Sequence, residues 1–308
     1  MSAMYYCGWD GGGTKTEVYA IGPDGQALID VSFGPLNPNG ASTDKVMETI
    51  RAAVDCMAGL PGGWAGCAAL VIGIAGVSNR RAAETVENAV RACGYAGPLK
   101  LLGDQEIALA GAVDGPGAVL IAGTGAICFG KDTMGRPFRV GGYGYLIDDG
   151  GSGYAIGRDI LSAAVRAIDG RSAPTCLTEL TFQALNVSDA QGIVTWLYAP
   201  GTGKKEVAAL APLLLTAIEQ EDAAACAIAR KAGDDLAELA VTAWRKTGMT
   251  HGELALTGSI LTRYPTIRER VIQAVQSALP NVSIHSPKGS AAQGAARLAM
   301  AYGKSLEQ

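Results

Sequence analysis

Near its N-terminus the sequence reads YYCGWDGGGTKTEVYAIGPDG, which covers residues 5–25. An apolar run leads into a glycine-rich turn at residues 10–15, and a second run alternates apolar and polar side chains over residues 16–21. The Asp-Gly pair at residues 24–25 follows closely. Alternation that ends at Asp-Gly is a strong signal for a β-hairpin. This stretch therefore predicts a strand, a glycine turn, a second strand and another tight turn.

The same pattern starts again at residue 118, where the sequence reads AVLIAGTGAICFGKDTMG. Gly13 precedes the turn glycine Gly25 by 12 positions, and Gly123 precedes Gly135 by the same 12 positions. A strand-loop-strand unit that recurs at matched spacing indicates two similarly built lobes that face one ligand.

The rest of the chain alternates strands with helices. Strands are predicted at residues 68–75, 99–102, 254–256 and 282–285, and helices at residues 43–57, 81–93, 106–113, 207–220, 223–244 and 266–278. This alternation implies an α/β fold with mostly parallel sheets and helices on their faces. We expect an N-terminal lobe over residues 1–115 and a C-terminal lobe with helical insertions over residues 116–308. The last helix, about 291–303, is a candidate for packing back on the N-terminal lobe.

Composition argues against several classes of partner and site. The formal net charge is -4 and the basic residues are scattered, so we expect no nucleic acid partner. The sequence has neither an apolar run of about 18 residues nor a signal-peptide pattern, so we expect a cytoplasmic protein without a membrane-spanning helix. The seven cysteines form no C-x-x-C pair, and the two histidines are too few to suggest a zinc or iron–sulfur site.

The two glycine-threonine loops, at residues 10–15 and 123–125, are candidates for binding phosphate. Successive backbone N–H groups in such turns converge on a phosphate, and Asp10 beside them can hold Mg²⁺ through water. Each loop alone is equally well explained as a tight hairpin, whereas two copies at matched spacing favour a nucleotide site. Residues 198–205, YAPGTGKK, lack the first glycine and the final Ser or Thr of a P-loop, so we predict an ordinary loop there. A dinucleotide fingerprint is also absent.

Six short motifs occur in a specific order along the chain. They are Asp10–Glu17, Gly73–Gly76, Gly103-Asp104, Ala122–Gly125, Gly141–Gly153 and Thr257–Ser259. In this order they resemble the N-acetylglucosamine and glucosamine kinases of the BadF/BadG/BcrA/BcrD ATPase family, within the actin, sugar kinase and Hsp70 superfamily. The resemblance covers about residues 5–300. Each motif alone is weak, and the ordered set is highly specific.

The resemblance implies two lobes of a duplicated actin-like ATPase (ribonuclease H-like) fold with a cleft between them, and a kinase that uses ATP and Mg²⁺. The residues it implies at the nucleotide are Gly11, Gly12, Gly13, Thr14, Lys15, Gly123, Thr124, Gly125, Gly258 and Ser259, with Asp10 at the metal. Those it implies at the sugar are Asn37, Asp104, Gly142, Tyr143, Gly144 and Asp149. It also implies a homodimer.

Asp104 is the predicted catalytic base. It follows a predicted strand and precedes a predicted helix, the position at which open α/β sheets bind ligands. A carboxylate there can accept the proton of a sugar hydroxyl while that oxygen attacks the γ-phosphorus. The alternative is a helix N-cap, which the residue type alone favours and the resemblance disfavours. Gln105 and Glu106 are expected to serve the start of the helix.

Several alternatives stay open. The acceptor is N-acetylglucosamine, glucosamine, N-acetylmuramic acid or another hexosamine, with O6 as the expected hydroxyl. The loop has Asp148-Asp149-Gly150 where relatives show Gly-Asp-Glu, so a shift by one would put Asp148 in the place of Asp149. Tyr143 stands where relatives usually have tryptophan. An ATPase activator of an acyl-CoA dehydratase or reductase is disfavoured by the unclustered cysteines. A sugar-sensing repressor is disfavoured because we see no helix-turn-helix ahead of Tyr5.

Overall fold

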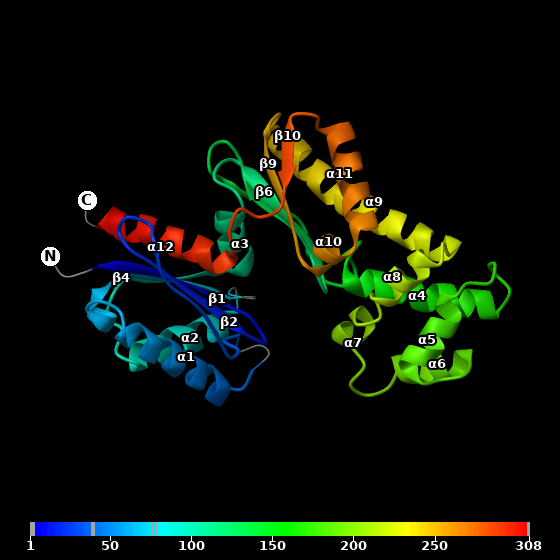
Figure 1. Ribbon diagram of the computed structural model, residues 1–308, viewed down its shortest axis with the longest axis horizontal. Helices are drawn as coiled ribbons and strands as arrows, with labels where there is room; N and C mark the ends of the chain where they lie inside the picture. The colour runs from blue at the N-terminus through cyan, green and yellow to red at the C-terminus, as the bar shows by residue number, and fades with distance from the viewer. Residues whose placement is uncertain (1–3, 38–40, 75–76, 78, 307–308) are drawn as a thin grey trace. The chain divides into compact units, whose positions relative to one another are not determined.

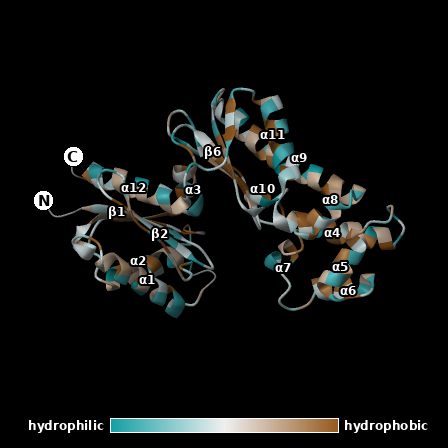
Figure 2. Ribbon diagram, in the orientation of Figure 1, coloured by the Kyte–Doolittle hydropathy of each residue, from teal (hydrophilic) through white to brown (hydrophobic). Residues whose placement is uncertain are grey.

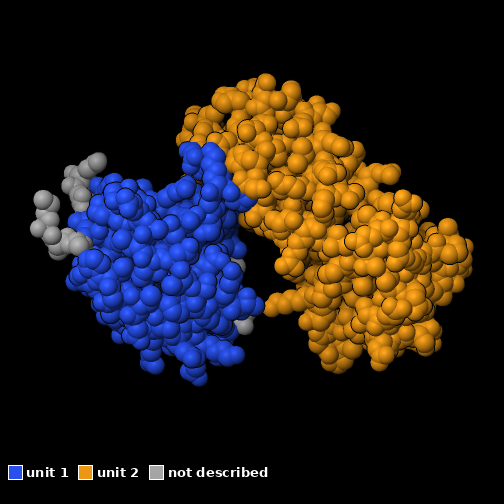
Figure 3. Space-filling view, in the orientation of Figure 1, with its two compact units in different colours: residues 1–114, 287–308 blue, residues 115–286 orange. Residues whose placement is uncertain are grey.

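The computed structural model describes residues 4–37, 41–74, 77 and 79–306. The chain forms two compact units, of which unit 1 comprises Met1–Asp114 and Pro287–Gln308, and unit 2 comprises Gly115–Ser286 (Figure 3). The C-terminal unit therefore ends at Ser286 rather than at residue 308. The last helix belongs to unit 1.

Unit 1 is built on a five-stranded sheet with the order β3-β2-β1-β4-β5. Its strands are β1 (Tyr5–Gly11), β2 (Thr16–Ile21), β3 (Ala27–Phe33), β4 (Cys67–Ile74) and β5 (Leu99–Gly103). β2 is antiparallel to β1 and to β3, whereas β4 is parallel to β1 and to β5. The carboxyl ends of β1, β4 and β5 therefore lie at one edge of the sheet.

Helices cover both faces of this sheet (Figure 1). They are α1 (Thr43–Ala58), α2 (Arg80–Ala92), α3 (Asp104–Ala112) and α12 (Ala291–Leu306), with a short 3₁₀ helix at Gly63–Gly66. Tyr5, Cys7 and Trp9 of β1 pack in one core with α1 and α2, whereas Tyr6 packs in a second core with α3 and α12. This alternation follows from the period of two residues along a strand.

Unit 2 contains a second five-stranded sheet with the order β10-β9-β6-β7-β8. Its strands are β6 (Gly117–Ala122), β7 (Ala126–Lys131), β8 (Pro137–Gly141), β9 (Gly252–Thr257) and β10 (Val282–His285). The helices of unit 2 are α4 (Gly153–Ile168), α5 (Leu177–Leu185), α6 (Ala190–Leu197), α7 (Lys204–Ala208), α8 (Leu213–Glu219), α9 (Ala223–Thr247), α10 (Ser259–Arg263) and α11 (Pro265–Ala278). α9 and α11 pack with β6 and β9 in the main core of this unit.

The two sheets repeat one topology, with β6 to β10 in the places of β1 to β5. Their hairpin turns also match: Gly25 N–H donates to Gly22 O over 2.9 Å, and Gly135 N–H donates to Asp132 O over 2.9 Å. Both turn glycines have positive φ, at 84° and 73°. The predicted duplication of an actin-like fold is confirmed. The sheets are mixed rather than mostly parallel, because each begins with a three-stranded antiparallel meander.

The predicted helices are found, except that the predicted helix 207–220 is broken into α7 and α8. Pro212 immediately precedes α8, and proline disrupts the interior of a helix because it has no N–H to donate. The helices carry polar as well as apolar residues (Figure 2). Among the residues described here, no helix has both the length and the hydropathy needed to cross a membrane.

Candidate active site

The first glycine loop is an exposed turn between β1 and β2. Gly12 N–H donates to Lys15 O over 3.0 Å, and Gly12 O accepts from Leu36 N–H and Asn37 N–H over 3.1 and 3.2 Å. Gly13, Thr14 and Lys15 are exposed, and a Cβ atom added to Gly13 would meet nothing within 4 Å. The turn is thus anchored at Gly12 and open to a ligand at its tip.

Asp10 lies near the end of β1, opposite Glu17 of β2. Burial raises the pKa of its carboxyl to about 6, and the negative charges of Glu17 and Asp104 add to this rise. Lys15 opposes the rise without cancelling it. A carboxylate held among other carboxylates is a favourable place for a cation.

Asp104 is the first residue of α3 and has an exposed side chain. The helix N-cap is Gly103, whose N–H donates to Glu106 Oε1 over 3.0 Å. The Asp104 carboxylate accepts the N–H of its neighbour Gln105 over 3.0 Å. Partial desolvation still raises the pKa of this carboxyl above its ordinary value. The alternative role of Asp104 as an N-cap is therefore wrong, because Gly103 and Glu106 start the helix.

Unit 1 brings its predicted site residues together. Asp10 precedes the carboxyl end of β1 and Asp104 follows β5, so both lie at one edge of the sheet, near enough for their charges to interact. Asn37 is buried and hydrogen-bonded through its backbone to Gly12. Of the motif Gly73–Gly76, the last two residues lie outside the described part of the chain.

The second glycine loop joins β6 to β7. Gly123 N–H donates to Gly125 O over 2.9 Å, and Gly123 O accepts Gly153 N–H at the start of α4 over 2.7 Å. Gly258 follows the neighbouring strand β9 at φ 92°, where an added Cβ would lie 2.3 Å from Ala122 O. Only glycine permits this approach, which brings Ser259 and the start of α10 to the loop.

A pocket of about 190 Å³ opens beside this loop. Its lining includes Gly123, Thr124 and Ser259, three of the residues predicted at the nucleotide. The other lining residues are mainly apolar and come from α7, α8, α10 and the segments beside them: Gly153, Ala208, Ala209, Ala211, Pro212, Leu215, Ile260, Arg263 and Tyr264. An apolar pocket with a few polar groups is suited to a nucleoside. The contribution of the α7–α8 segment was not foreseen, because its residues carry no phosphate-binding pattern.

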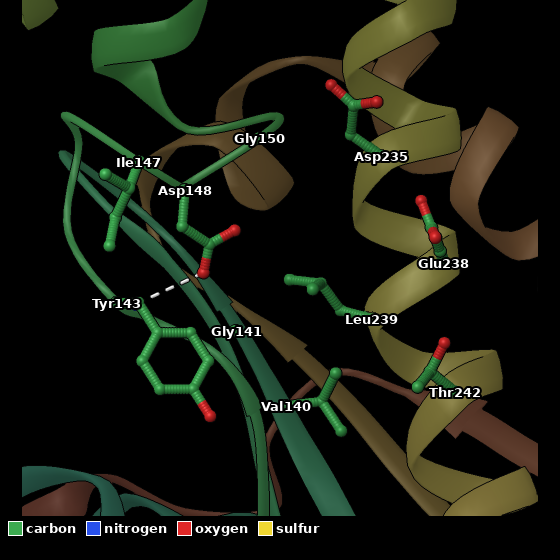
Figure 4. A pocket seen from close by; sticks show the side chains of 10 residues that line it. All are labelled: Val140, Gly141, Tyr143, Ile147, Asp148, Gly150, Asp235, Glu238, Leu239 and Thr242. Atoms are coloured by element: carbon green, nitrogen blue, oxygen red, sulfur yellow. Dashed lines mark hydrogen bonds between the residues drawn. The ribbon is translucent and has the colours of Figure 1, made fainter.

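The loop after β8 carries four of the six residues predicted at the sugar: Gly142, Tyr143, Gly144 and Asp149. Gly142 has φ 73° and Gly144 has φ 100°, and the exposed Tyr143 ring lies under the Arg139 guanidinium at 4.5 Å. Asp148 accepts Tyr143 N–H over 3.1 Å (Figure 4). Both residues line a pocket of about 620 Å³ whose far wall is α9, with Asp235, Glu238, Leu239 and Thr242 (Figure 4).

Asp149 lies apart from that pocket. Its side chain is 3% exposed, its φ is 63°, and one oxygen forms an ion pair with Lys204 Nζ at 2.8 Å. The other oxygen accepts Ala126 N–H over 3.4 Å, next to the second glycine loop. The structure therefore joins Asp149 to the loop at residues 123–125, and it adds Lys204, a residue that the sequence offered only within an ordinary loop.

The model of the BadF/BadG/BcrA/BcrD ATPase family matches residues 7–299. The N-acetylmuramic acid/N-acetylglucosamine kinase of Clostridium acetobutylicum is 30% identical over 299 residues, which are 96% of this chain and 98% of that protein. The N-acetyl-D-glucosamine kinase of Dictyostelium discoideum is 28% identical, over 97% of this chain and 99% of its own. A solved structure from Chromobacterium violaceum, named as a candidate N-acetylglucosamine kinase, has a TM-score of 0.75 at 27% identity and covers 97% of this chain and 99% of its own.

Proposed function

Because the chain belongs to the BadF/BadG/BcrA/BcrD ATPase family, we propose that it is an ATP-dependent kinase of N-acetylglucosamine or a related hexosamine. The phosphate is transferred to a hydroxyl of the sugar, which we assign to O6. The observation that carries this proposal is the pair of carboxylates Asp10 and Asp104 at one edge of the unit 1 sheet, beside an open glycine loop. The relatives named as amino-sugar kinases, which align along nearly the whole chain, support the choice of substrate.

Asp104 acts as the general base in this proposal. It accepts the proton of the sugar hydroxyl as that oxygen bonds to the γ-phosphorus, while the bond from the γ-phosphorus to the bridging oxygen of ADP breaks. Its side chain is exposed and the N-cap of α3 is Gly103, so the carboxylate oxygen that does not accept the Gln105 N–H can approach a substrate. The raised pKa of this carboxyl makes it a better proton acceptor than an ordinary aspartate.

Asp10 is the residue that would hold Mg²⁺. The residues described contain no group of three or more metal-ligating side chains, but Mg²⁺ in kinases is held by one or two carboxylates together with the substrate phosphates. The donor chemistry of Asp10 fits that arrangement, since burial and like charges both favour a neighbouring cation. When bound, Mg²⁺ neutralises part of the charge on the phosphates.

The nucleotide is assigned to both glycine loops. We assign the phosphates to Gly11, Gly12, Gly13, Thr14 and Lys15 in unit 1 and to Gly123, Thr124 and Gly125 in unit 2, where Thr14 and Thr124 add two hydroxyl donors to the backbone amides that the turns leave open. Ser259 lines the pocket of about 190 Å³, to which we assign the nucleoside, and Gly258 directly precedes it in the chain. We assign the sugar to Asn37, Asp104 and the loop Gly142–Gly144, whereas the Asp149 carboxylate is paired with Lys204 beside the second glycine loop. We also expect a cytoplasmic homodimer.

One assay tests the proposal. Purified protein incubated with ATP, Mg²⁺ and a panel of hexosamines should yield a sugar phosphate, identified by mass spectrometry and by ³¹P NMR. Asp104→Asn should lower kcat by about 10²- to 10⁴-fold, because it removes the proton acceptor while keeping the shape of the side chain. Asp55→Asn, at an exposed position on α1, is the matched control and should keep full activity. The proposal fails if no hexosamine is phosphorylated, or if both variants are equally active.

A further inference from the structure

Lys204 stands directly beside the second glycine loop. Its Nζ atom lies 2.8 Å from Asp149 Oδ2 and 5.7 Å from the centre of the Tyr145 ring, and its side chain is 30% exposed. A Cβ atom added to Gly125 would lie 2.9 Å from Lys204 Nζ and 2.9 Å from Asp149 Oδ2. The ammonium group therefore contacts the last residue of the loop, and glycine at position 125 is what leaves room for it.

The helix that carries Lys204 is held firmly in place. α7 packs against α4, where a Cβ added to Gly157 would lie 2.0 Å from Val207 O and one added to Gly153 would lie 3.6 Å from Ala208 Cβ. The start of α7 is fixed by the Gly203 N–H, which donates to Glu206 Oε2 over 2.9 Å. Lys204 is therefore built into the unit 2 scaffold rather than carried on an unsupported loop.

The same short helix also borders the pocket to which we assign the nucleoside. Ala208, at its far end, lines this pocket together with Gly123 and Thr124. The glycine loop thus has the pocket at its first two residues and Lys204 with Asp149 at its last. A nucleotide whose nucleoside occupies the pocket has its phosphates at the loop, where Lys204 supplies positive charge.

We propose that Lys204 binds the terminal phosphates of ATP and that Asp149 positions its ammonium group for this contact. The inference rests on the proposed use of ATP. An ammonium group has three N–H donors, so it can keep its bond to Asp149 and still donate to phosphate oxygens. A lysine at this place also neutralises charge that develops on the transferred group.

Removing Lys204 alone would leave the Asp149 carboxylate buried without a cation, which is costly to the fold. The test therefore includes Lys204→Ala and the double variant Asp149→Asn with Lys204→Gln, which replaces the ion pair by two neutral amides of similar shape. Lys205→Ala is the matched control, because Lys205 is the next residue of α7 and is exposed. Circular dichroism and thermal melting check that every variant is folded.

The affinities of AMP, ADP and a non-hydrolysable ATP analogue are then measured by isothermal titration calorimetry with Mg²⁺ and without sugar. We expect both Lys204 variants to bind the ATP analogue about 10-fold or more weakly, while AMP binding changes less than about 2-fold. Lys205→Ala should bind all three nucleotides with the same affinity as the unmodified protein. The inference is overturned if the affinities of all three nucleotides fall by the same factor, which indicates a purely structural ion pair. It is also overturned if none of the three affinities falls.

This measurement is independent of the sugar. If no hexosamine is phosphorylated but the Lys204 variants still lose affinity for the ATP analogue alone, the proposed acceptor is wrong and the role of Lys204 stands. If a sugar phosphate forms and the Lys204 variants bind ATP normally, the proposed kinase activity is supported and the proposed role of Lys204 is wrong.

Discussion

At the level of single residues, the unit 1 site depends on carboxylates that are held close to one another in a partly buried place. The pKa of Asp10 is raised to about 6 by burial and by the charges of Glu17 and Asp104. Such an arrangement costs stability in the absence of a cation, because the ionised form is poorly solvated. Carboxyl groups with a raised pKa are expected where a metal ion and phosphate groups bind.

The raised pKa of Asp10 predicts how the stability of the ligand-free protein depends on pH. The folded state keeps the proton up to about pH 6 and the unfolded state loses it near the ordinary value of 3.8, so the Asp10 contribution falls as pH rises between these values. Asp10→Asn should therefore stabilise the ligand-free protein at pH 7 by up to about 3 kcal/mol. Urea denaturation at pH 4 and pH 7, without Mg²⁺, measures this.

The control for this measurement is Asp30→Asn, at an exposed position on β3. It should leave the difference in unfolding free energy between pH 4 and pH 7 unchanged. A loss of stability at pH 7 in Asp10→Asn would show that Asp10 is not destabilised by ionisation. The same substitution should lower sugar-kinase activity at saturating Mg²⁺, so stability and activity should change in opposite directions.

At the level of elements, the unit 2 site depends on close approaches between loops and strand ends. β6 and β9 are parallel neighbours, so the second glycine loop and the start of α10 follow adjacent strands at the same edge. Gly258 lets these segments touch, at a place where an added Cβ would lie 2.3 Å from Ala122 O. Ser259, the next residue after Gly258, lines the pocket beside the loop together with Gly123 and Thr124.

Two glycine substitutions distinguish the cost of losing this close contact from the cost of placing alanine at positive φ. Gly258→Ala and Gly135→Ala both place alanine at positive φ, but an added Cβ at Gly135 meets nothing within 4 Å. Gly135→Ala should cost about 1 kcal/mol of unfolding free energy and leave the KM for ATP unchanged. Gly258→Ala should cost clearly more, about 2 kcal/mol or above, and raise the KM for ATP because α10 must move away from the loop.

Thermal or urea unfolding together with ATP-dependent kinetics decides this comparison. Equal losses of stability in the two variants would mean that the contact with Ala122 is not what Gly258 provides. An unchanged KM for ATP in Gly258→Ala would mean that α10 does not contribute to the nucleotide site.

At the level of the whole molecule, unit 1 is completed by the last segment of the chain. α12 packs on β1, β4 and α3, and Ala295, Ala296 and Ala299 are fully buried in that contact. A Cβ added to Gly8 would lie 2.1 Å from Ala296 N, so the helix lies almost directly on the strand. One face of the unit 1 sheet therefore depends on residues that follow all of unit 2.

A truncation tests this dependence. A chain that ends at Ser286 should lose hydrogen-exchange protection in β1 and β4, because Tyr6 and Val71 lose their cover and the remaining face is apolar. β6 and β9 of unit 2 should stay protected, since their core lies within Gly115–Ser286. A chain that ends at Leu306 serves as the control. Full protection of β1 in the shorter chain would contradict the prediction.

Much of this protein can be predicted from the sequence, because the decisive signals are local. The Asp-Gly pair at residues 24–25 and the matched spacing from Gly13 to Gly25 and from Gly123 to Gly135 predict two copies of one hairpin, and the structure contains them. The family and the fold predicted from the ordered motifs are confirmed. The roles of Asp104, Asn37 and the other site residues stay predictions.

Tertiary structure alone decided how these pieces combine. The ion pair of Lys204 with Asp149 joins residues 55 positions apart, and α12 covers β1 from the other end of the chain. No local pattern encodes such contacts, because they depend on which surfaces pack together within each folded unit. The sequence therefore determined the elements, the duplication and the family, whereas packing over long separations determined which side chains share a site.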